Sequence, residues 1–399
     1  MPDKESKGEG RGPAYIALET TEPSTWGHGW ISGLVSAILG IVGLGTVLCF
    51  RFPNALVMPE LKGHYPVQYI RAALHVVLVS SFLLGTLSLW LRRNKLLGLL
   101  GIALTLMAAI LGGSQMPIEG DSTLGPLLGI DWFILNLVGY SALYIPLERL
   151  FAKRPEQPTF RKEWHVDLLY FFLNSVLIQV TTVLTLKPAM VFFHWAQIES
   201  IERTVSAWPV LLQVAILLLV ADFAQYWVHR AFHTIPALWR FHAVHHSAEA
   251  MDWLAGSRLH LVDAVLTRAL TYVPIYLLGF SESALFVYLF IVAVQATFIH
   301  ANVRWEFAAI RRFIATPCFH HWHHSAEPEA VDKNFSIHSP IWDRLFGTYH
   351  MPGRWPESYG LCGQRDVPPG WLRQFLYPFK RRSPKGLGAE TQANAFRRD

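Results

Sequence analysis

The sequence is poor in charge and in cysteine. Only 16% of its 399 residues are charged, whereas 52% are hydrophobic, and the mean hydropathy is +0.28. Its three cysteines, Cys49, Cys318 and Cys362, are widely spaced and form no CxxC motif. They provide no disulfide framework, so a disulfide-stabilised secreted domain is excluded. The composition instead favours a polytopic membrane protein.

Several motifs that carry redox or hydrolytic chemistry are also absent. The sequence contains no GxGxxG dinucleotide fingerprint, no CxxCH haem-attachment site and no HExxH zinc motif. If the protein catalyses a redox reaction, its electrons must therefore come from an external donor.

Long hydrophobic runs, by contrast, follow one another along the chain. They occupy about residues 31–50, 68–91, 96–113, 128–147, 166–193, 208–228 and 264–303. A helix of about 20 apolar residues spans the hydrocarbon layer. The last run is long enough for two crossings, with a turn at Leu278–Ser283. We therefore predict an all-α, polytopic membrane helical bundle with about eight crossings.

The charges in the loops predict the orientation. Arg92, Arg93 and Lys95 follow the second run, whereas the loop between the third and fourth runs carries Glu119 and Asp121 and no basic residue. The positive-inside rule then places both termini in the cytoplasm. The net charge of +5 fits such basic loops better than a nucleic-acid surface, so we expect no nucleic-acid partner.

Histidine is concentrated in one stretch. Eleven of the 18 histidines lie within residues 229–324. Eight of them form an HxxxH and two HxxHH groups: His229 and His233; His242, His245 and His246; His320, His323 and His324. Residues at i, i+3 and i+4 share one face of a helix, so the imidazoles of each group can converge. The predicted topology puts all three groups in a helical cap on the cytoplasmic side.

The number of imidazoles predicts two metal ions. A structural zinc takes four ligands and a catalytic zinc takes three plus water, so eight ligands exceed the needs of one ion. Imidazole binds iron, zinc, copper and nickel alike, and the ligand type alone does not identify the metal.

These three boxes and their flanks resemble the fatty acid hydroxylase/sterol desaturase superfamily of membrane di-iron enzymes. The resemblance includes the segment Asp222–Arg230 before the first box, and Asn334-Phe335 and Ile341–Tyr349 after the last. It covers roughly residues 135–350, and about the first 125 residues lie outside it. It implies two iron ions, O2 as cosubstrate, an external electron donor, and hydroxylation or desaturation of a C–H bond of a membrane lipid (sterol, fatty acyl or ether lipid).

The resemblance and the composition together predict four segments. We expect a disordered cytoplasmic tail at 1–29, a three-helix transmembrane extension at 30–125, a catalytic domain at 126–360 and a basic C-terminal tail at 361–399.

Four further residues are candidates for supporting or ligand roles. Asp222 precedes His229 by two helical turns, and a carboxylate near the membrane is costly unless paired, so we interpret it as an acceptor for an imidazole N–H. The alternative is a hydrogen bond to a neighbouring helix. Tyr226 lies on the same stripe. The resemblance supports His300 as a further metal ligand, with Asn302 beside it.

The sequence indicates the roles of two other histidines less clearly. Many superfamily members have a His-Pro pair where this chain has His260-Leu261, which leaves His260 as an additional candidate ligand. His338 follows the last box and is expected at the surface.

Two other classes of function also fit a histidine-rich membrane protein. A zinc-dependent membrane hydrolase would need a general base, for which Glu249 is the nearest candidate. A metal transporter or sensor would need ionisable residues near the middle of several helices, and the first three runs are nearly uncharged.

Overall fold

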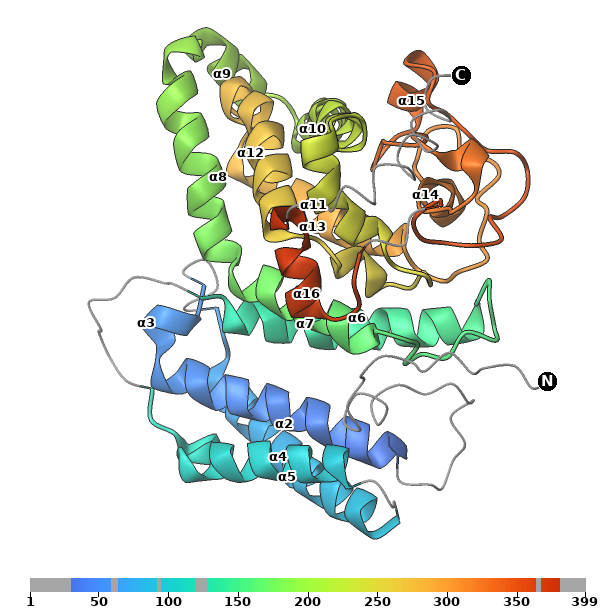
Figure 1. Cartoon of the computed structure of the whole chain (residues 1–399). Coiled ribbons are helices and arrows are strands. Elements are labelled where there is room, and N and C mark those ends of the chain that lie inside the picture. The colour runs from blue at the N-terminus through green and yellow to red at the C-terminus, as the bar shows by residue number, and fades with distance from the viewer. Residues whose placement is uncertain (1–29, 59–63, 92–94, 119–127, 364–366, 381–399) are drawn as a thin grey trace, which may run out of the picture. The chain divides into compact units, whose positions relative to one another are not determined.

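The computed structural model describes residues 30–58, 64–91, 95–118, 128–363 and 367–380 (Figure 1). These residues form helices and loops, and two isolated β-bridges join Ala152 to Val303 and Ser325 to Tyr359. The predicted all-α fold is therefore confirmed. The expected tail at 1–29, residues 364–366 and 381–399 of the expected tail at 361–399, and the predicted acidic loop around Glu119 lie outside the described residues.

The chain divides into two compact units. The helices that lie in the first unit are α2 (Trp30–Arg51), α3 (Pro53–Leu56), α4 (Val67–Leu91), α5 (Leu96–Ile110) and η1 (Gly113–Gln115). Helices α6 (Ile130–Leu150), α7 (Trp164–Val176) and α8 (Ile178–Phe193) contribute residues to both units.

The second unit carries all the histidine boxes. Its remaining helices are η2 (His194–Ala196), α9 (Glu199–Ser206), α10 (Val210–Thr234), α11 (Pro236–His246), η3 (Ala255–Ser257), α12 (Leu261–Leu278), α13 (Glu282–Phe298), α14 (Pro317–His323), η4 (Pro328–Ala330), α15 (Ile341–Leu345), α16 (Trp371–Leu376) and η5 (Tyr377–Phe379).

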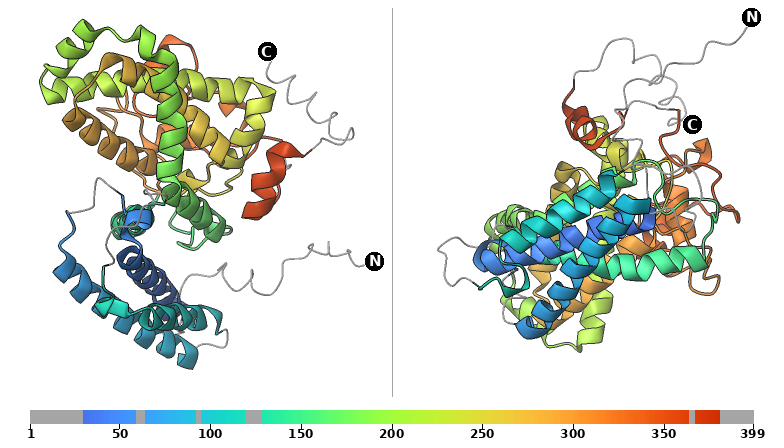
Figure 2. Two further views of the ribbon diagram at one scale, coloured as in Figure 1. Left: turned by 90° about the vertical axis from the view of Figure 1, so that its left-hand side faces the viewer. Right: turned by 90° about the horizontal axis from the view of Figure 1, so that it is seen from below.

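The first unit is built on close packing of α2, α4 and α5, which lie side by side (Figure 2). Small residues permit this approach, because a Cβ added at Gly101 of α5 would collide with Ser36 of α2. The buried hydroxyls bind one another and the backbone. The Ser36 hydroxyl donates to the Ser81 carbonyl (2.6 Å), the Ser81 hydroxyl donates to the Ser36 carbonyl (2.8 Å), and Thr105 Oγ1 donates to Ser81 Oγ (2.7 Å).

The number of helices that can cross a membrane agrees with a multi-pass protein. Among the described residues, six helices are long and apolar enough, namely α2, α4, α5 with η1, α6, α10 and α12. The pair α7 and α8 passes the same test only together and is bent by 52°, and α13 is a shorter apolar helix. The predicted total of eight crossings and the cytoplasmic orientation stay predictions.

A tight turn joins α12 to α13 within the predicted Leu278–Ser283 segment. Helix α12 ends at Leu278, and Gly279 adopts a left-handed conformation with φ 64°. Ser281 then caps α13 by accepting a hydrogen bond from the Ala284 N–H. Helices α10, α12 and α13 pack around a core that includes Leu217, Ile275 and Tyr288. This core supports the histidine-bearing ends of α10 and α13.

Candidate metal centre

A sharp helix break brings the first two boxes together. The first box occupies the end of α10, which stops at Thr234, and α11 begins at Pro236. A proline at the first position of a helix loses no hydrogen bond, so the chain can change direction there. The second box forms the last turns of α11 and ends at His246.

The third box lies on the short helix α14. Thr316 caps this helix by accepting a hydrogen bond from the Phe319 N–H (3.4 Å), and Pro317 opens it. His300 follows the end of α13 and is buried.

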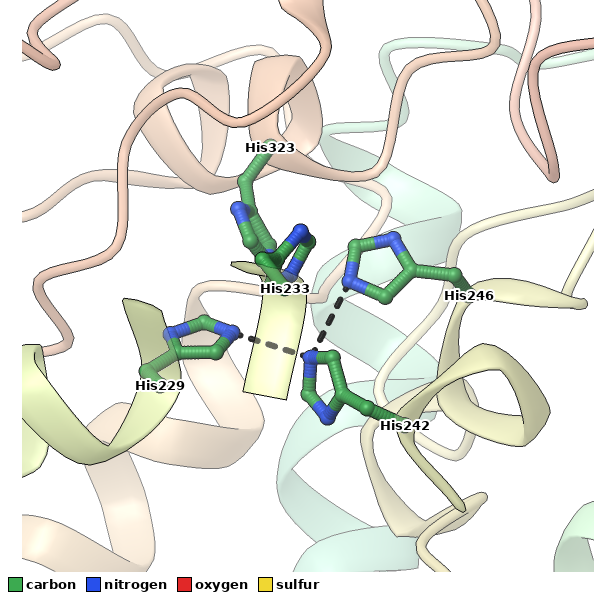
Figure 3. A group of neighbouring side chains, drawn as sticks. All are labelled: His229, His233, His242, His246 and His323. Atoms are coloured by element: carbon green, nitrogen blue, oxygen red, sulfur yellow. Dashed lines mark hydrogen bonds between the residues drawn. The ribbon is translucent and has the colours of Figure 1, made fainter. Parts of the chain in front are cut away.

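The nine predicted ligands assemble into two buried groups. In each group, one ring nitrogen of every histidine lies within 4.8 Å of the corresponding nitrogens of the others. The first group contains His229, His233, His242, His246 and His323, whose rings turn toward one another in Figure 3. The second contains His245, His300, His320 and His324. The second and third boxes each contribute to both groups, which places the two groups beside each other.

Hydrogen bonds at Nδ1 fix many of these rings. His242 Nδ1 donates to the Asp263 carboxylate (2.7 Å), and His233 Nδ1 approaches the Asp332 carboxylate (3.3 Å). Backbone carbonyls accept the Nδ1 protons of four others: Phe335 for His229 (2.7 Å), Lys333 for His323 (2.8 Å), Arg258 for His245 (3.1 Å) and Ala296 for His300 (2.7 Å). A ligand imidazole held in this way keeps its Nε2 lone pair free for a metal.

The free Nε2 atoms face one another at short distances. His229 Nε2 and His242 Nε2 are 3.0 Å apart. Because both residues use their Nδ1 proton elsewhere, both Nε2 atoms are acceptors, and two acceptors repel unless a cation lies between them. Two nitrogens at about 2.1 Å from one ion, at right angles, are separated by about 3.0 Å. The donor set therefore fits a metal ion.

The second group repeats the arrangement. His245 Nε2 and His300 Nε2 are 3.4 Å apart, and the Nδ1 of each already donates to a backbone carbonyl. In the first group, the Nε2 atom of His323 is buried and has no hydrogen-bond partner within the described part of the chain. Buried polar atoms without partners are rare in proteins, and at this position a metal ion would satisfy them.

Burial favours the neutral form of six of these imidazoles. It lowers the pKa of His300 to about 4 and the pKa of His323 to about 3. Burial also lowers the pKa of His245, His246, His320 and His324, with a further contribution from the neighbouring histidines. The neutral imidazole is the form that binds metals.

Comparison with known proteins assigns the chain to a family. The sequence profile described as fatty acid hydroxylase matches residues 214–348, which include every histidine of the two groups. An ornithine lipid hydroxylase of Rhizobium tropici is 32% identical over 265 residues, which cover 64% of this chain and 78% of the relative. The chain belongs to the fatty acid hydroxylase/sterol desaturase superfamily. The resemblance seen in the three boxes is thereby confirmed.

Other superfamily members match over shorter stretches or at lower identity. An alkylglycerol monooxygenase of Danio rerio is 31% identical over 160 residues, which span 39% of this chain and 34% of that protein. A putative methylsterol monooxygenase of Dictyostelium discoideum is 25% identical over 235 residues, or 56% of this chain and 83% of that protein. No solved structure matches the chain.

Asp222 has different partners from the imidazole that we expected. Its carboxylate accepts hydrogen bonds from the backbone N–H groups of Ile337, His338 and Ser339, at 2.8 to 3.0 Å. The loop after the third box folds back onto α10. Three of its backbone N–H groups donate to the buried carboxylate of Asp222. Asp222 thus binds the backbone of a loop, and neither the expected imidazole nor a neighbouring helix is its partner in these contacts.

Tyr226 acts on the site only through a chain of contacts. Its hydroxyl lies 3.0 Å from Thr348 Oγ1, which donates to Asp343 (2.6 Å). Asp343 in turn accepts the Phe335 N–H (2.7 Å), and the Phe335 carbonyl accepts the proton of His229.

Asn302 and His260 also differ from the expectation. The Asn302 side chain pairs with the backbone N–H (2.9 Å) and carbonyl (3.0 Å) of Arg154. His260 lies outside both groups, because it caps α12 through Nδ1 and donates from Nε2 to the Phe375 carbonyl (3.1 Å). His321, in the middle of the third box, donates from Nε2 to the His300 carbonyl (3.2 Å) and lies outside both groups.

Several supporting residues were not found from the sequence. Asp263 lies 21 residues after His242, and Asp332 lies 99 residues after His233. Asp332 and Asn334 adopt left-handed conformations (φ 57° and 59°). This turn aims the carbonyls of Lys333 and Phe335 at two histidines. The Asn334-Phe pair of the superfamily flank was the available signal, because asparagine and aspartate tolerate this conformation.

Proposed function

We propose that this protein is a membrane-bound, O2-dependent di-iron oxidoreductase that hydroxylates a C–H bond of a membrane lipid. One observation carries the proposal: nine buried imidazoles form two adjacent groups in which Nε2 atoms face each other. The names of the relatives, a lipid hydroxylase and lipid monooxygenases, support the reaction type.

The iron ions would be held by the two groups of histidines. His229, His233, His242, His246 and His323 would hold one ion, and His245, His300, His320 and His324 the other. When bound, the two irons would supply the chemistry that activates O2 for cleavage of an unactivated C–H bond. The overall reaction consumes two electrons and two protons: R–H + O2 + 2 e⁻ + 2 H⁺ gives R–OH + H2O.

The residues of the chain position and shield the metals in this reaction. Asp263 holds the Nδ1 proton of His242, and the carbonyls of Phe335 and Arg258 hold those of His229 and His245. Their burial excludes water, which prevents side reactions of a strongly oxidising centre. We propose that the histidines act as ligands and that an external donor supplies the electrons.

The substrate is proposed to be a membrane lipid with a polar headgroup. Among the named relatives described above, the ornithine lipid hydroxylase aligns over the longest stretch, so an ornithine lipid is the first substrate to test. An alkylglycerol is the second. Desaturation rather than hydroxylation would consume the same two electrons and one O2, and it is distinguished by its product.

The domain limits and the orientation are also proposals. We propose that residues 126–360 form the catalytic domain, since the family match at 214–348 and both histidine groups fall inside it. We propose that residues 30–125 form a separate three-helix extension. The active site would face the cytoplasm, on the basis of the arginines and lysines that follow the second and fourth apolar runs.

Isotope labelling tests the reaction type. Purified iron-loaded protein in detergent is incubated with ornithine lipid or alkylglycerol, a reductase–ferredoxin pair and ¹⁸O2, and the lipids are analysed by mass spectrometry. A lipid product that carries one ¹⁸O atom supports a monooxygenase. A cleaved lipid formed equally well without O2, by protein that contains zinc, would overturn the proposal in favour of a membrane hydrolase.

A further inference from the structure

A second buried histidine site lies outside the two metal groups. His338 was expected at the surface, yet only 5% of it is exposed. Neither of its ring nitrogens has a hydrogen-bond partner among the residues that the structure describes. Burial lowers the pKa of His338 to about 4, so the ring is neutral and presents one donor and one acceptor. Such a group is costly to bury unless something binds it.

The backbone around His338 is held firmly in place. Its N–H donates to Asp222 (3.0 Å), and its carbonyl accepts from the Ala315 N–H (2.9 Å) and from Gln295 Nε2 (3.4 Å). Both backbone groups are therefore satisfied, and the side chain alone lacks partners. A ring carried on a fixed backbone is pre-organised for a ligand.

The position of His338 relates it to the membrane. Asp222 lies at the midpoint of α10, a helix that is long and apolar enough to cross the bilayer. The loop that contains His338 thus reaches the middle of this helix. Irregular backbone at such a depth occurs where protein encloses it or where it lines a cavity, and polar side chains there are usually functional.

Polar residues of neighbouring helices lie near His338. The ring of Tyr288 on α13 lies 6.3 Å from that of His338, at an interplanar angle of 71°. On α12, Tyr272 packs on the core that contains Tyr288. On α10, the Asp222 carboxylate accepts hydrogen bonds from three backbone N–H groups, including that of His338. Tyr288 is therefore the hydroxyl-bearing side chain that the structure places beside the imidazole.

The geometry of α10 relates this site to the metal groups. Asp222 precedes His229 by seven residues, which corresponds to about 10 Å along the helix. A lipid that enters from the bilayer has its chains deepest and its headgroup nearest the cytoplasmic side. If a C–H bond near the headgroup lies at the metals, the ester or amide junction between headgroup and chains lies on the membrane side of them.

We propose that His338 and Tyr288 bind the ester or amide carbonyl at the junction between the headgroup and the acyl chains of the lipid substrate. The N–H of the neutral imidazole and the phenol O–H both donate to carbonyl oxygens. His338 is a specificity-determining residue in this arrangement, because the distance from the junction to the metals selects the carbon that is oxidised. This inference rests on the proposed lipid hydroxylation and deepens it.

Matched variants test the contact. His338→Leu removes both ring nitrogens, His338→Gln restores a neutral donor and acceptor, and Tyr288→Phe removes the hydroxyl. Tyr276→Phe on α12 is the control, since its hydroxyl binds Gln197 instead (2.8 Å). The affinity for an ornithine lipid, which has an amide and an ester, is measured in detergent micelles by quenching of tryptophan fluorescence, together with kcat and KM.

The expected result is a rise of about tenfold in Kd and KM for His338→Leu and Tyr288→Phe, as for loss of a buried hydrogen bond. His338→Gln should recover most of the affinity, and metal content should not change. Oxidation at a shifted carbon in His338→Leu would add to the support.

Two results would overturn the inference. One is unchanged Kd and KM in His338→Leu together with raised thermal stability, which is the behaviour of a ring that binds only water. The other is failure of the wild type to bind the ornithine lipid. Neither result would affect the metal content or the ¹⁸O incorporation with other lipids on which the proposed function depends, so the two failures are distinguishable.

Discussion

The N-terminal bundle and the histidine region both bury polar groups among apolar helices, but they satisfy those groups differently. In the bundle, the hydroxyls of Ser36, Ser81 and Thr105 bind one another and backbone carbonyls. In the histidine region, the Nδ1 atoms of His229 and His242 have partners, whereas their Nε2 atoms face each other as acceptors. The three hydroxyls are satisfied within the bundle. The facing Nε2 atoms would be satisfied by bound cations, and this difference points to the histidine region as the functional site.

The largest expected effect is the loss of one ligand. His245→Ala should empty the group of four, so that metal content falls by about half and lipid oxidation falls below detection, because both ions are needed. His194→Ala, an exposed histidine that binds Gln197, is the control. Metal content is measured by mass spectrometry of the purified protein. Full activity in His245→Ala would contradict the assignment of this group.

Low pH should lower the stability of the histidine region but not that of the N-terminal bundle. The folded-state pKa of His300 is about 4 and that of His323 about 3, both below the unfolded value near 6.5. Below pH 6.5 the unfolded chain binds more protons, so stability falls with pH down to about 4 and 3, by up to about 1.4 kcal/mol per pH unit for each such histidine. Bound metal should be released over the same range.

Thermal unfolding in detergent at pH 7.5 and 5.5 measures this effect. The metal-free protein should have the lower Tm at pH 5.5. A Tm that does not change between the two values would contradict the buried, neutral state of the imidazoles.

Loss of a supporting carboxylate should weaken metal binding without abolishing it. Asp263→Asn keeps the size of the side chain but removes the charge that accepts the His242 Nδ1 proton. Metal affinity should fall by about 10- to 100-fold, or about 1.4 to 2.7 kcal/mol. Competition with a chelator measures the change. Glu329→Gln, an exposed carboxylate paired with Arg354, should leave affinity unchanged.

One methyl group added beside the site should have a smaller effect. A Cβ at Gly256 would lie 2.8 Å from His300 Nδ1, so Gly256→Ala must shift this ring. We expect partial loss of metal from the group of four, with little change in the helical content. Gly139→Ala, where nothing lies within 4 Å of the added Cβ, serves as the control for Gly256→Ala and also for the variant Gly101→Ala described below.

A glycine-to-alanine substitution in the N-terminal bundle should leave the metal content unchanged. Gly101→Ala brings a Cβ against Ser36, and overpacking of this kind costs about 1 to 3 kcal/mol. The variant should unfold at a lower temperature than Gly139→Ala, measured by circular dichroism, and retain its full metal content. Loss of metal in Gly101→Ala would mean that the two regions are not independent in the way the comparison requires.

The sequence predicted the members of the site better than their arrangement. Spacing at i, i+3 and i+4 was enough to show that the imidazoles of each box share a face, and the superfamily resemblance added His300. The division into groups of five and four depends on how α10, α11 and α14 meet, which no local spacing encodes. His245 and His246 are neighbours in sequence, yet they belong to different groups.

The hydrogen-bond partners of the ligand histidines could not be predicted, because they are brought to these histidines only by the tertiary fold. Phe335 contributes its carbonyl to His229 only because Asp343 holds its N–H and the turn at Asp332 and Asn334 aims the chain. His338 is buried for a related reason, since Asp222 draws its loop onto α10. A polar residue outside any motif is expected at the surface, and only the tertiary structure reveals that the carboxylate predicted to serve an imidazole holds this loop instead.

The most direct test is the number and kind of metal ions in the wild-type protein. The protein is expressed with ample iron, purified in detergent, and analysed for all first-row metals per chain. About two irons per chain are expected, one for each group of imidazoles. Zinc alone, retained despite the iron, or no metal in well-folded protein would contradict the di-iron centre.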